Sequence, residues 1–303
     1  MMRDYISPTT LAKILITAGI AVLLLFRMDW AHVGEMTLHL QAAAWTGALG
    51  VMAVQIFLLA WRWESLCDDN GMTYPRSLIV TLAALLSNLL LITSISGVFV
   101  RIALSAQYGL TWIKAACAAI ADRLMTMFAL VILAALLMPG LDQLISPQLY
   151  RNLAMSLLAF IGICGLLVPL FFAEKLQILL ARNGKIKEVR DYIRALLKRP
   201  LQAAKVVAAS LAAQVAYFVA VFIIARATGA DITFSQLLIV VPVIALVASL
   251  PLSFGGWGVR EGAFIYGLGL LGVPMETAFL ISVQVGLLSL LARRRITHNL
   301  LQL

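Results

Sequence analysis

The stretch that decides the fold reads LPLSFGGWGVREGAFIYG from residue 250 to residue 267. Earlier in the chain, residues 91–109 read LITSISGVFVRIALSAQYG. When Ser94–Arg101 is placed on Ser253–Arg260, four of the eight positions are identical: a Ser, a Gly, a Val and the final Arg. Each copy follows a long apolar run and precedes a shorter apolar helix and then a full-length apolar segment. The sequence therefore predicts an internal duplication.

The composition around these stretches is that of an integral membrane protein. Of the 303 residues, 62% are hydrophobic and 12% are charged, and the mean hydropathy is +0.99. Soluble domains carry about 25% charged residues, so this chain has too few for a water-facing surface. A helix that crosses a bilayer needs about 20 mainly apolar residues and satisfies its own backbone hydrogen bonds. We therefore expect an all-α membrane protein with a single transmembrane domain over residues 1–303.

Apolar segments of helical length fill most of the chain. They lie at about 11–26, 40–60, 77–93, 112–138, 152–173, 203–225, 235–250, 261–272 and 275–292. Arg3 and Lys13 lie at the N-terminal side of the first segment, as positive charges do in a signal peptide. No small-residue cleavage site follows that segment, so we expect it to be a retained first span.

One long polar stretch, residues 174–199, contains eight Lys or Arg against three acidic residues. It is either an amphipathic helix lying on the cytoplasmic leaflet or a solvated basic loop that only sets the topology. In both cases it should be cytoplasmic, as should Arg293–Arg295 after the last span. With the N-terminus inside as well, the first two spans leave Arg62–Arg76 in the cytoplasm. We expect both termini to face the cytoplasm of a bacterial inner membrane.

This topology favours a helical bundle with two re-entrant helix pairs. Residues 77–110 would dip into the membrane from the cytoplasmic side, and residues 235–272 would dip in from the opposite side. Helix pairs that insert from opposite faces are typical of inverted-repeat transporters. The units would be repeat one at about 40–173, a basic linker at 174–200 and repeat two at about 203–292. If each pair were instead two full crossings, every later segment would still lie on the same side of the membrane. Arg101, Arg260 and Glu261 favour re-entrant pairs, because a charge inside the membrane is tolerated where it lines a cavity.

The helix that follows each small-residue turn predicts an anion site. Its first turn presents backbone N–H groups, and an arginine in the first turns adds a guanidinium that can hold a phosphate with two hydrogen bonds. Glycine lets the backbone approach a ligand closely and adopt positive φ. The residues expected to bind a head group or substrate are Arg101, Arg260, Gly97, Ser253, Gly255, Gly256 and Gly258. The alternative is that the glycines only allow tight helix packing and the arginines are held in buried ion pairs.

Three further ionisable residues, Glu261, Asp122 and Arg123, are expected to serve either coupling or ion pairing. Charged residues inside a membrane are functional candidates by default. On a helix, Arg260 and Glu261 should point in different directions, so Glu261 could bind a coupling proton or cation, or neutralise an arginine elsewhere. Asp122 and Arg123 lie about ten residues, or roughly 15 Å, into their span, and a buried pair that joins the two repeats is the alternative there.

The sequence offers no metal centre, cofactor site or catalytic constellation. Its cysteines and histidines lack ligand spacing: Cys67, Cys117, Cys164, His32, His39 and His298. No GxSxG, HExxH or GKS/GKT motif occurs, so we expect that the protein is not an enzyme. The formal net charge of +9 could suggest nucleic acid. Most of the excess, however, lies in the basic stretch and at the C-terminus beside apolar spans, where it would face anionic lipid.

The second stretch resembles a known family signature. Ser253–Glu261, preceded by Pro251, is similar to the P-x-S-x-GG-x-G-x-RE signature of the lysylphosphatidylglycerol synthase transmembrane-region family, which is called flippase-like. The resemblance covers about residues 75–292. No soluble aminoacyltransferase domain follows the membrane segments in this chain, so the resemblance implies lipid translocation rather than lipid aminoacylation.

Two other elements of the family have counterparts here. Ser94–Arg101 is similar to an earlier P-S-x-GGD-x-x-R element, although Ser96 and Val98 replace a glycine and an acid and the proline is missing. Asp122 and Arg123 are similar to the family's acidic-Arg pair.

These observations lead us to expect a translocase that moves a lipid with an anionic or charged head group between the leaflets of the cytoplasmic membrane. Its partners would be membrane lipids, with no nucleic acid, and it could form homo-oligomers. A secondary transporter of a small organic anion is the alternative, and a lipid-modifying enzyme is disfavoured by the lack of a nucleophile. A lateral opening fit for acyl chains would favour the first function, and a sealed, water-lined pocket the second.

Overall fold

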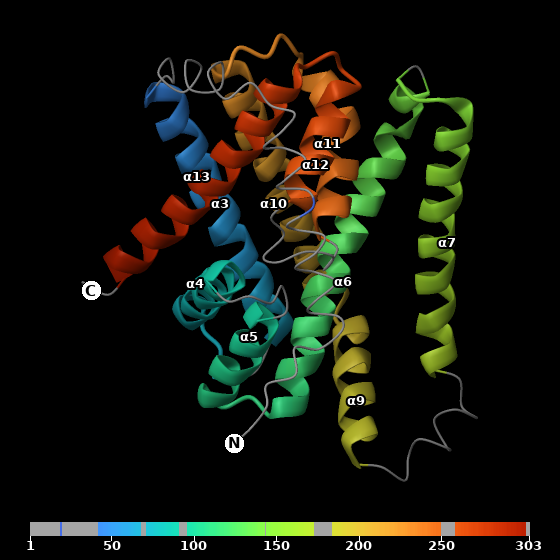
Figure 1. The fold of residues 1–303 in the computed structure, drawn as a ribbon. Coiled ribbons are helices and arrows are strands. Elements are labelled where there is room, and N and C mark those ends of the chain that lie inside the picture. The colour runs from blue at the N-terminus through green and yellow to red at the C-terminus, as the bar shows by residue number, and fades with distance from the viewer. Residues whose placement is uncertain are drawn as a thin grey trace, which may run out of the picture.

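The computed structural model describes residue 19 and residues 42–67, 71–90, 96–142, 144–172, 184–249 and 258–300. The predicted first span at 11–26 lies outside these ranges apart from residue 19. Every regular element in the described part is a helix, which confirms the predicted all-α fold. In chain order (Figure 1) the elements are α3 (Ala42–Cys67), α4 (Tyr74–Leu90), α5 (Ser96–Gln107), α6 (Trp112–Leu137), the 3₁₀ helix η1 (Met138–Leu141), α7 (Pro147–Phe172), α9 (Gly184–Lys198), α10 (Pro200–Ala227), α11 (Phe234–Ser249), α12 (Val259–Gly269) and α13 (Met275–Leu300).

Several of these helices confirm the prediction of a multi-pass membrane protein. Four in the described part are long and apolar enough to cross a bilayer: Ala42–Cys67, Trp112–Leu141, Pro200–Ala227 and Met275–Arg293. By contrast, α4 has 17 residues and α11 has 16, fewer than the 20 or so that a crossing needs. Short helices of this kind suit elements that enter a membrane without crossing it.

The centre of the bundle is an antiparallel pair of long helices, α3 and α10. The amide of Gln202, near the start of α10, donates to the carbonyl oxygen of Ser65, near the end of α3, at 2.5 Å. Ala48, Ala60 and Ala220 are fully buried in the same core. Small side chains let helix backbones approach closely, and such packing holds helices together in lipid, where the hydrophobic effect between them is weak.

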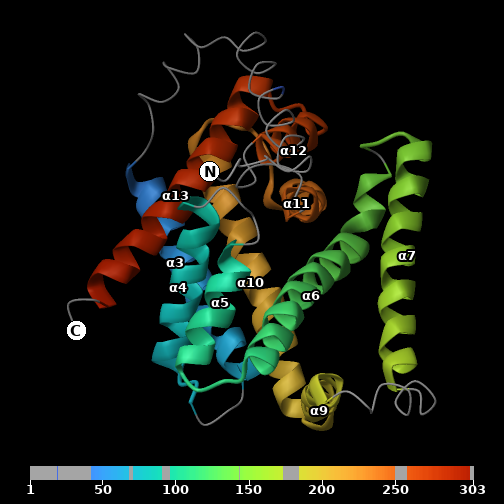
Figure 2. The same ribbon diagram turned by 60° about the horizontal axis from the view of Figure 1, so that its bottom comes forward.

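Two helical hairpins, α4–α5 and α11–α12, lie at opposite ends of this central pair. Figure 1 shows α4–α5 at the end of the molecule where α3 finishes and α6 begins, and α11–α12 at the end where α10 finishes and α13 begins. The turned view in Figure 2 keeps the members of each hairpin side by side. Hairpins that open toward opposite ends are what inverted repeats require. The duplication, the repeat boundaries and the membrane insertion of the hairpins stay predictions.

The basic stretch, residues 174–199, contains a helix, α9 (Gly184–Lys198), which packs on α6 and α10. The hydroxyl of Tyr192 donates to the carbonyl oxygen of Leu66 at 2.9 Å, and burial raises the pKa of this hydroxyl above its usual range, so it stays a donor. Arg194 and Lys198 are exposed. One apolar face and one charged face support the amphipathic alternative, and contact with anionic lipid stays a prediction.

Candidate functional site

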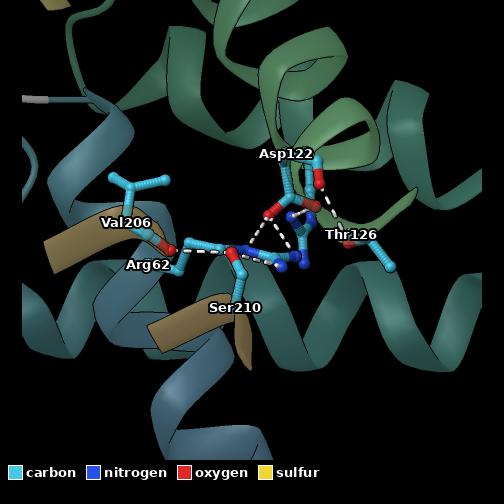
Figure 3. Close-up of polar contacts among 6 residues, drawn as sticks. Arg62, Asp122, Thr126, Val206 and Ser210 are labelled. Atoms are coloured by element: carbon cyan, nitrogen blue, oxygen red, sulfur yellow. Dashed lines mark hydrogen bonds and ion pairs between the residues drawn. The ribbon is translucent and has the colours of Figure 1, made fainter. Parts of the chain in front are cut away.

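A buried cluster of charged residues lies where α3, α5 and α6 meet. The carboxylate of Asp122 on α6 accepts hydrogen bonds from Nε of Arg62 at 2.8 Å and from Nη1 of Arg101 at 2.5 Å. Nη2 of Arg62 approaches the same carboxylate to 2.7 Å. Figure 3 shows the guanidinium of Arg62 reaching this carboxylate from α3. Two cations thus share one anion.

Further contacts extend this cluster to a fourth helix. Nη1 of Arg62 donates to Oγ of Ser210 on α10 at 3.2 Å. The guanidinium of Arg101 lies over the ring of Trp63, 4.7 Å from its centroid, a favourable cation–π position. Arg62 is 2% exposed and Arg101 and Asp122 are each 7% exposed. Because these charges are out of water, losing one partner would be strongly destabilising.

The structure extends one expected span in this region. The second span was expected at about 40–60 with Arg62 beyond it, but α3 continues to Cys67 and buries the Arg62 side chain. Asp122, expected to serve either coupling or ion pairing, forms ion pairs with Arg62 and Arg101. The signal that could have found Arg62 is its helical position: it follows the buried Ala48 by fourteen residues, close to four turns, and so shares its face.

The second predicted arginine belongs to a different group, at the start of α12. Gly258 is the N-cap, with φ of 85°, a conformation that glycine adopts without strain. Its backbone N–H donates to Oε2 of Glu261 at 2.5 Å. The other oxygen of Glu261 accepts Nε and Nη2 of Arg260 at 3.0 and 2.7 Å and Oγ of Ser282 on α13 at 3.3 Å.

The expectation that Arg260 and Glu261 diverge is therefore wrong. Glu261 folds back to cap its own helix, as in a capping box, and this brings its carboxylate within reach of the preceding guanidinium. The Glu261 side chain is 3% exposed and that of Arg260 is 19% exposed. The ion-pair alternative thus holds in this structure for Arg260, as it does for Arg101. Ser253, Gly255 and Gly256 of the same motif lie outside the described residues.

The guanidinium of Arg260 rests on a bare patch of α13. A Cβ added at Gly286 would come within 2.5 Å of Nη2 and 2.7 Å of Nη1 of Arg260. The absence of a side chain at Gly286 is therefore what admits Arg260 between the two helices. No local sequence signal distinguishes Gly286 from other glycines in apolar helices, so its role could not be predicted.

The remaining predicted glycine, Gly97, has a packing role. A Cβ at Gly97 would lie 2.5 Å from both the carbonyl oxygen of Ala84 and Oδ1 of Asn88. The backbone N–H of Gly97 donates to that Oδ1 at 2.8 Å, so this N–H at the start of α5 is bonded to α4. The structure does not bring Arg101 and Arg260 together: the first lies with Asp122, and the second lies against α13.

An apolar pocket of about 350 Å³ opens along α12 directly after its charged first turn. Small-molecule sites typically have about 300–1,000 Å³. The pocket is bounded by α11, α12 and the segment from η1 to α7. Its lining side chains are apolar apart from one tyrosine hydroxyl and comprise Leu141, Ile145, Leu149, Leu153, Val240, Val243, Ile244, Val247, Gly262, Ala263, Tyr266, Gly267 and Leu270.

Within the described residues, no group of three or more His, Cys, Asp or Glu is placed to hold a metal ion. The site consists instead of two arginine-carboxylate groups inside a helical bundle and an apolar pocket beside one of them. These features define a multi-pass helical membrane protein with charged groups at its interior.

The chain belongs to the lysylphosphatidylglycerol synthase transmembrane-region family, whose profile it matches over residues 10–293. This confirms the resemblance and extends it over nearly the whole chain. The family places the protein among integral membrane proteins of the lipid-related, flippase-like kind. No curated protein matches the chain.

Proposed function

We propose that this protein moves a lipid with an anionic or charged head group between the leaflets of the bacterial cytoplasmic membrane. The observation that carries the proposal is the apolar pocket, which begins at Gly262, two residues after Arg260. A phospholipid offers one charged group joined to long apolar chains, and α12 offers one charged turn followed by an apolar wall. A small soluble anion has no apolar chain that could bind to that wall.

The two parts of this surface are aligned along the helix. Gly267, which lines the pocket, follows Arg260 by seven residues, close to two full turns or about 10 Å. Arg260 therefore lies on the same face of α12 as Gly267, about one helical turn before the lining residue Ala263. A lipid phosphate held at Arg260 would leave its acyl chains directed along Ala263 and Tyr266 toward the middle of the pocket.

Arginine is suited to this task because its planar guanidinium carries five N–H donors. In the structure, Nε and Nη2 face Glu261. A lipid phosphate could therefore displace the Glu261 carboxylate or bind beside it. When no lipid is bound, Glu261 provides the negative charge that Arg260 needs inside the protein. Such exchange between two anions suits a transporter, which must release its substrate as well as bind it.

Transport of a small organic anion is the second candidate function. The Arg62–Asp122–Arg101 cluster favours it, because two cations with one anion leave a positive charge inside the protein. The cluster lies apart from the apolar pocket, so it could serve an anion without acyl chains. Neither function includes a chemical step, and we propose that the protein is not an enzyme.

The test is lipid translocation by the purified protein in liposomes that contain fluorescent phosphatidylglycerol. Arg260→Ala should abolish translocation, and Arg260→Lys should impair it strongly, because lysine keeps the charge but lacks the planar two-pronged donor. Arg226→Ala is the matched control, since Arg226 is a half-exposed arginine paired with Asp231. Normal translocation by Arg260→Ala, or a loss of thermal stability that accounts for its defect, would overturn the assignment.

A second arm separates the two candidate functions. No atom lies within 4 Å of a Cβ added at Gly262, so Gly262→Leu should fill pocket space without disturbing the backbone. Lipid translocation should fall in this variant. Unchanged lipid translocation, with saturable uptake of a small organic anion, would favour the second candidate.

A further inference from the structure

Helices α4 and α5 run antiparallel, and two contacts fix how they are aligned. Near the turn of the hairpin, the backbone N–H of Gly97 in α5 donates to Oδ1 of Asn88 in α4, and a Cβ at Gly97 would meet the carbonyl oxygen of Ala84. At the other end, a Cβ at Gly71, just before α4, would meet the carbonyl oxygen of Tyr108, just after α5. Residues counted back along α4 and forward along α5 from the first contact therefore lie opposite each other.

This alignment brings polar residues of the two helices together. Thr81 and Ser77 precede the α4 side of the Gly97 contact by about one and two helical turns, so they lie on the face of α4 that meets α5. Arg101 and Ser105 follow Gly97 by four and eight residues and lie on the facing side of α5. Thr81 is thus opposite Arg101, and Ser77 is opposite Ser105. These four residues form a polar seam between the helices.

Four buried polar groups at this seam make no hydrogen bond to any described residue. They are Oγ of Ser77, Oγ1 of Thr81, Oγ of Ser105 and, on the adjoining helix α3, Nε1 of Trp63. All four residues are 0% exposed. Buried polar groups are nearly always hydrogen-bonded, and one without a partner destabilises the fold. The indole N–H can only donate, so its partner has to be an acceptor.

An excess of positive charge lies at the same place. The guanidinium of Arg101 lies over the ring of Trp63, 4.7 Å from its centroid, and is therefore close to the indole N–H. In the described part of the chain its hydrogen bonds go to Asp122 alone, although a guanidinium carries five N–H groups. Asp122 also pairs with Arg62, so one negative charge serves two positive charges. An acceptor that binds here is therefore favoured if it is an anion.

The exposed fractions limit the size of such an anion and the side from which it arrives. The side chains of Arg101 and Asp122 are 9% and 10% exposed, whereas that of Arg62 is 2% exposed. An ion can therefore reach the Arg101 side of the cluster. The groups that require an acceptor are fully buried among α3, α4 and α5, which pack on one another, so the ligand has to be small. The excess is one charge, so a monovalent ion balances it.

We propose that the first hairpin holds a chloride ion at Arg101, in contact with Nε1 of Trp63 and Oγ1 of Thr81. The ion accepts hydrogen bonds from these groups and neutralises the charge that Asp122 leaves unbalanced. The hydroxyls of Ser77 and Ser105 continue the polar seam one turn farther from the hairpin turn. This site is separate from Arg260 and the apolar pocket, so the inference does not depend on the proposed function. A bound chloride also removes the charge that favours the second candidate function.

The experiment measures thermal unfolding of the purified protein in detergent. Sodium gluconate is replaced stepwise by sodium chloride at constant ionic strength. A ligand that binds only the folded protein raises its unfolding temperature, so the unfolding temperature of the wild type should rise with chloride and reach a plateau. Parallel titrations with sodium phosphate and with short-chain phosphatidylglycerol test whether the seam instead binds a phosphate or a lipid head group.

Two variants test the proposed contacts. Thr81→Val and Trp63→Phe keep the shape or the aromatic face but remove one donor each, and each should weaken chloride affinity at least fivefold. In gluconate, Thr81→Val should unfold at the same temperature as the wild type or higher, because it removes a buried hydroxyl that has no partner. Thr126→Val is the matched control, since the Thr126 hydroxyl already donates to the carbonyl oxygen of Asp122 at 2.9 Å (Figure 3). It should keep the chloride affinity of the wild type.

The outcomes decide the inference independently of transport. A wild type whose unfolding temperature does not respond to chloride would overturn it, and so would stabilisation by phosphate or short-chain phosphatidylglycerol alone. Equal chloride affinity in Thr81→Val and Thr126→Val would also refute the site. If Trp63→Phe does not fold, Thr81→Val decides, because valine has the shape of threonine. A wild type that translocates no lipid would overturn the proposed function and leave the chloride titration unaffected.

Discussion

Replacing Asp122 by Asn removes the one negative charge that Arg62 and Arg101 share. Asp122 accepts Nε and Nη2 of Arg62 at 2.8 and 2.7 Å and Nη1 of Arg101 at 2.5 Å. The asparagine amide keeps the shape and one acceptor oxygen but leaves both guanidiniums without this counter-charge. Breaking a buried ion pair from one side costs about 3–5 kcal/mol. We expect Asp122→Asn to lower the free energy of unfolding by that amount.

The assay is unfolding of the purified protein in mixed micelles with increasing sodium dodecyl sulfate, followed by circular dichroism. Asp142→Asn is the matched control, because Asp142 is exposed and surface substitutions usually change stability by less than about 0.5 kcal/mol. Arg62→Met should cost less than Asp122→Asn, since it leaves Arg101 and Asp122 as a neutral pair. A change for Asp122→Asn within about 0.5 kcal/mol of the control would refute the idea that this cluster holds α3, α5 and α6 together.

Two glycine substitutions should separate stability from transport. Gly97→Ala places a Cβ 2.5 Å from the backbone oxygen of Ala84, and this oxygen cannot move away unless α4 moves. The substitution should therefore lower the unfolding midpoint in the same assay. Gly47→Ala is the control and should not lower it, because a Cβ there meets nothing within 4 Å. The three atoms nearest to a Cβ at Gly286 all belong to the end of the Arg260 side chain, which is flexible. Gly286→Ala should therefore leave the unfolding midpoint nearly unchanged and slow lipid translocation in liposomes. Normal translocation would show that the position of Arg260 is not critical.

Several site residues were predictable because a local signal marks them. Arg101, Arg260, Glu261 and Asp122 are charged residues inside apolar segments, and charge at membrane depth is costly enough to require a reason. Gly258 was expected to allow positive φ, and its φ is 85°. These expectations needed only the residue type and its neighbours along the chain.

Other residues that join the helices carried no such signal. Arg62 lies near the end of a span, where a charge normally reaches water, and only the continuation of α3 past it shows that it is buried. Arg293 opens a run of three arginines, a pattern typical of a cytoplasmic flank. Its Nη1 donates to the carbonyl oxygen of Leu85 at 2.8 Å, a contact that depends on how α13 crosses α4. Gly286 is distinguished only by the arginine that rests on it.

The sequence by itself determined that this protein is a helical membrane protein, where its main spans lie and that two similar small-residue turns each precede an arginine. Those conclusions follow from hydropathy and motif, which are properties of contiguous residues. Only the tertiary structure decided that Arg101 and Arg260 lie in separate clusters, that Asp122 joins two arginines, and that an apolar pocket lies along α12 beyond its first turn. Partners 21 to 208 residues apart in the chain are set by helix packing, which no local pattern records.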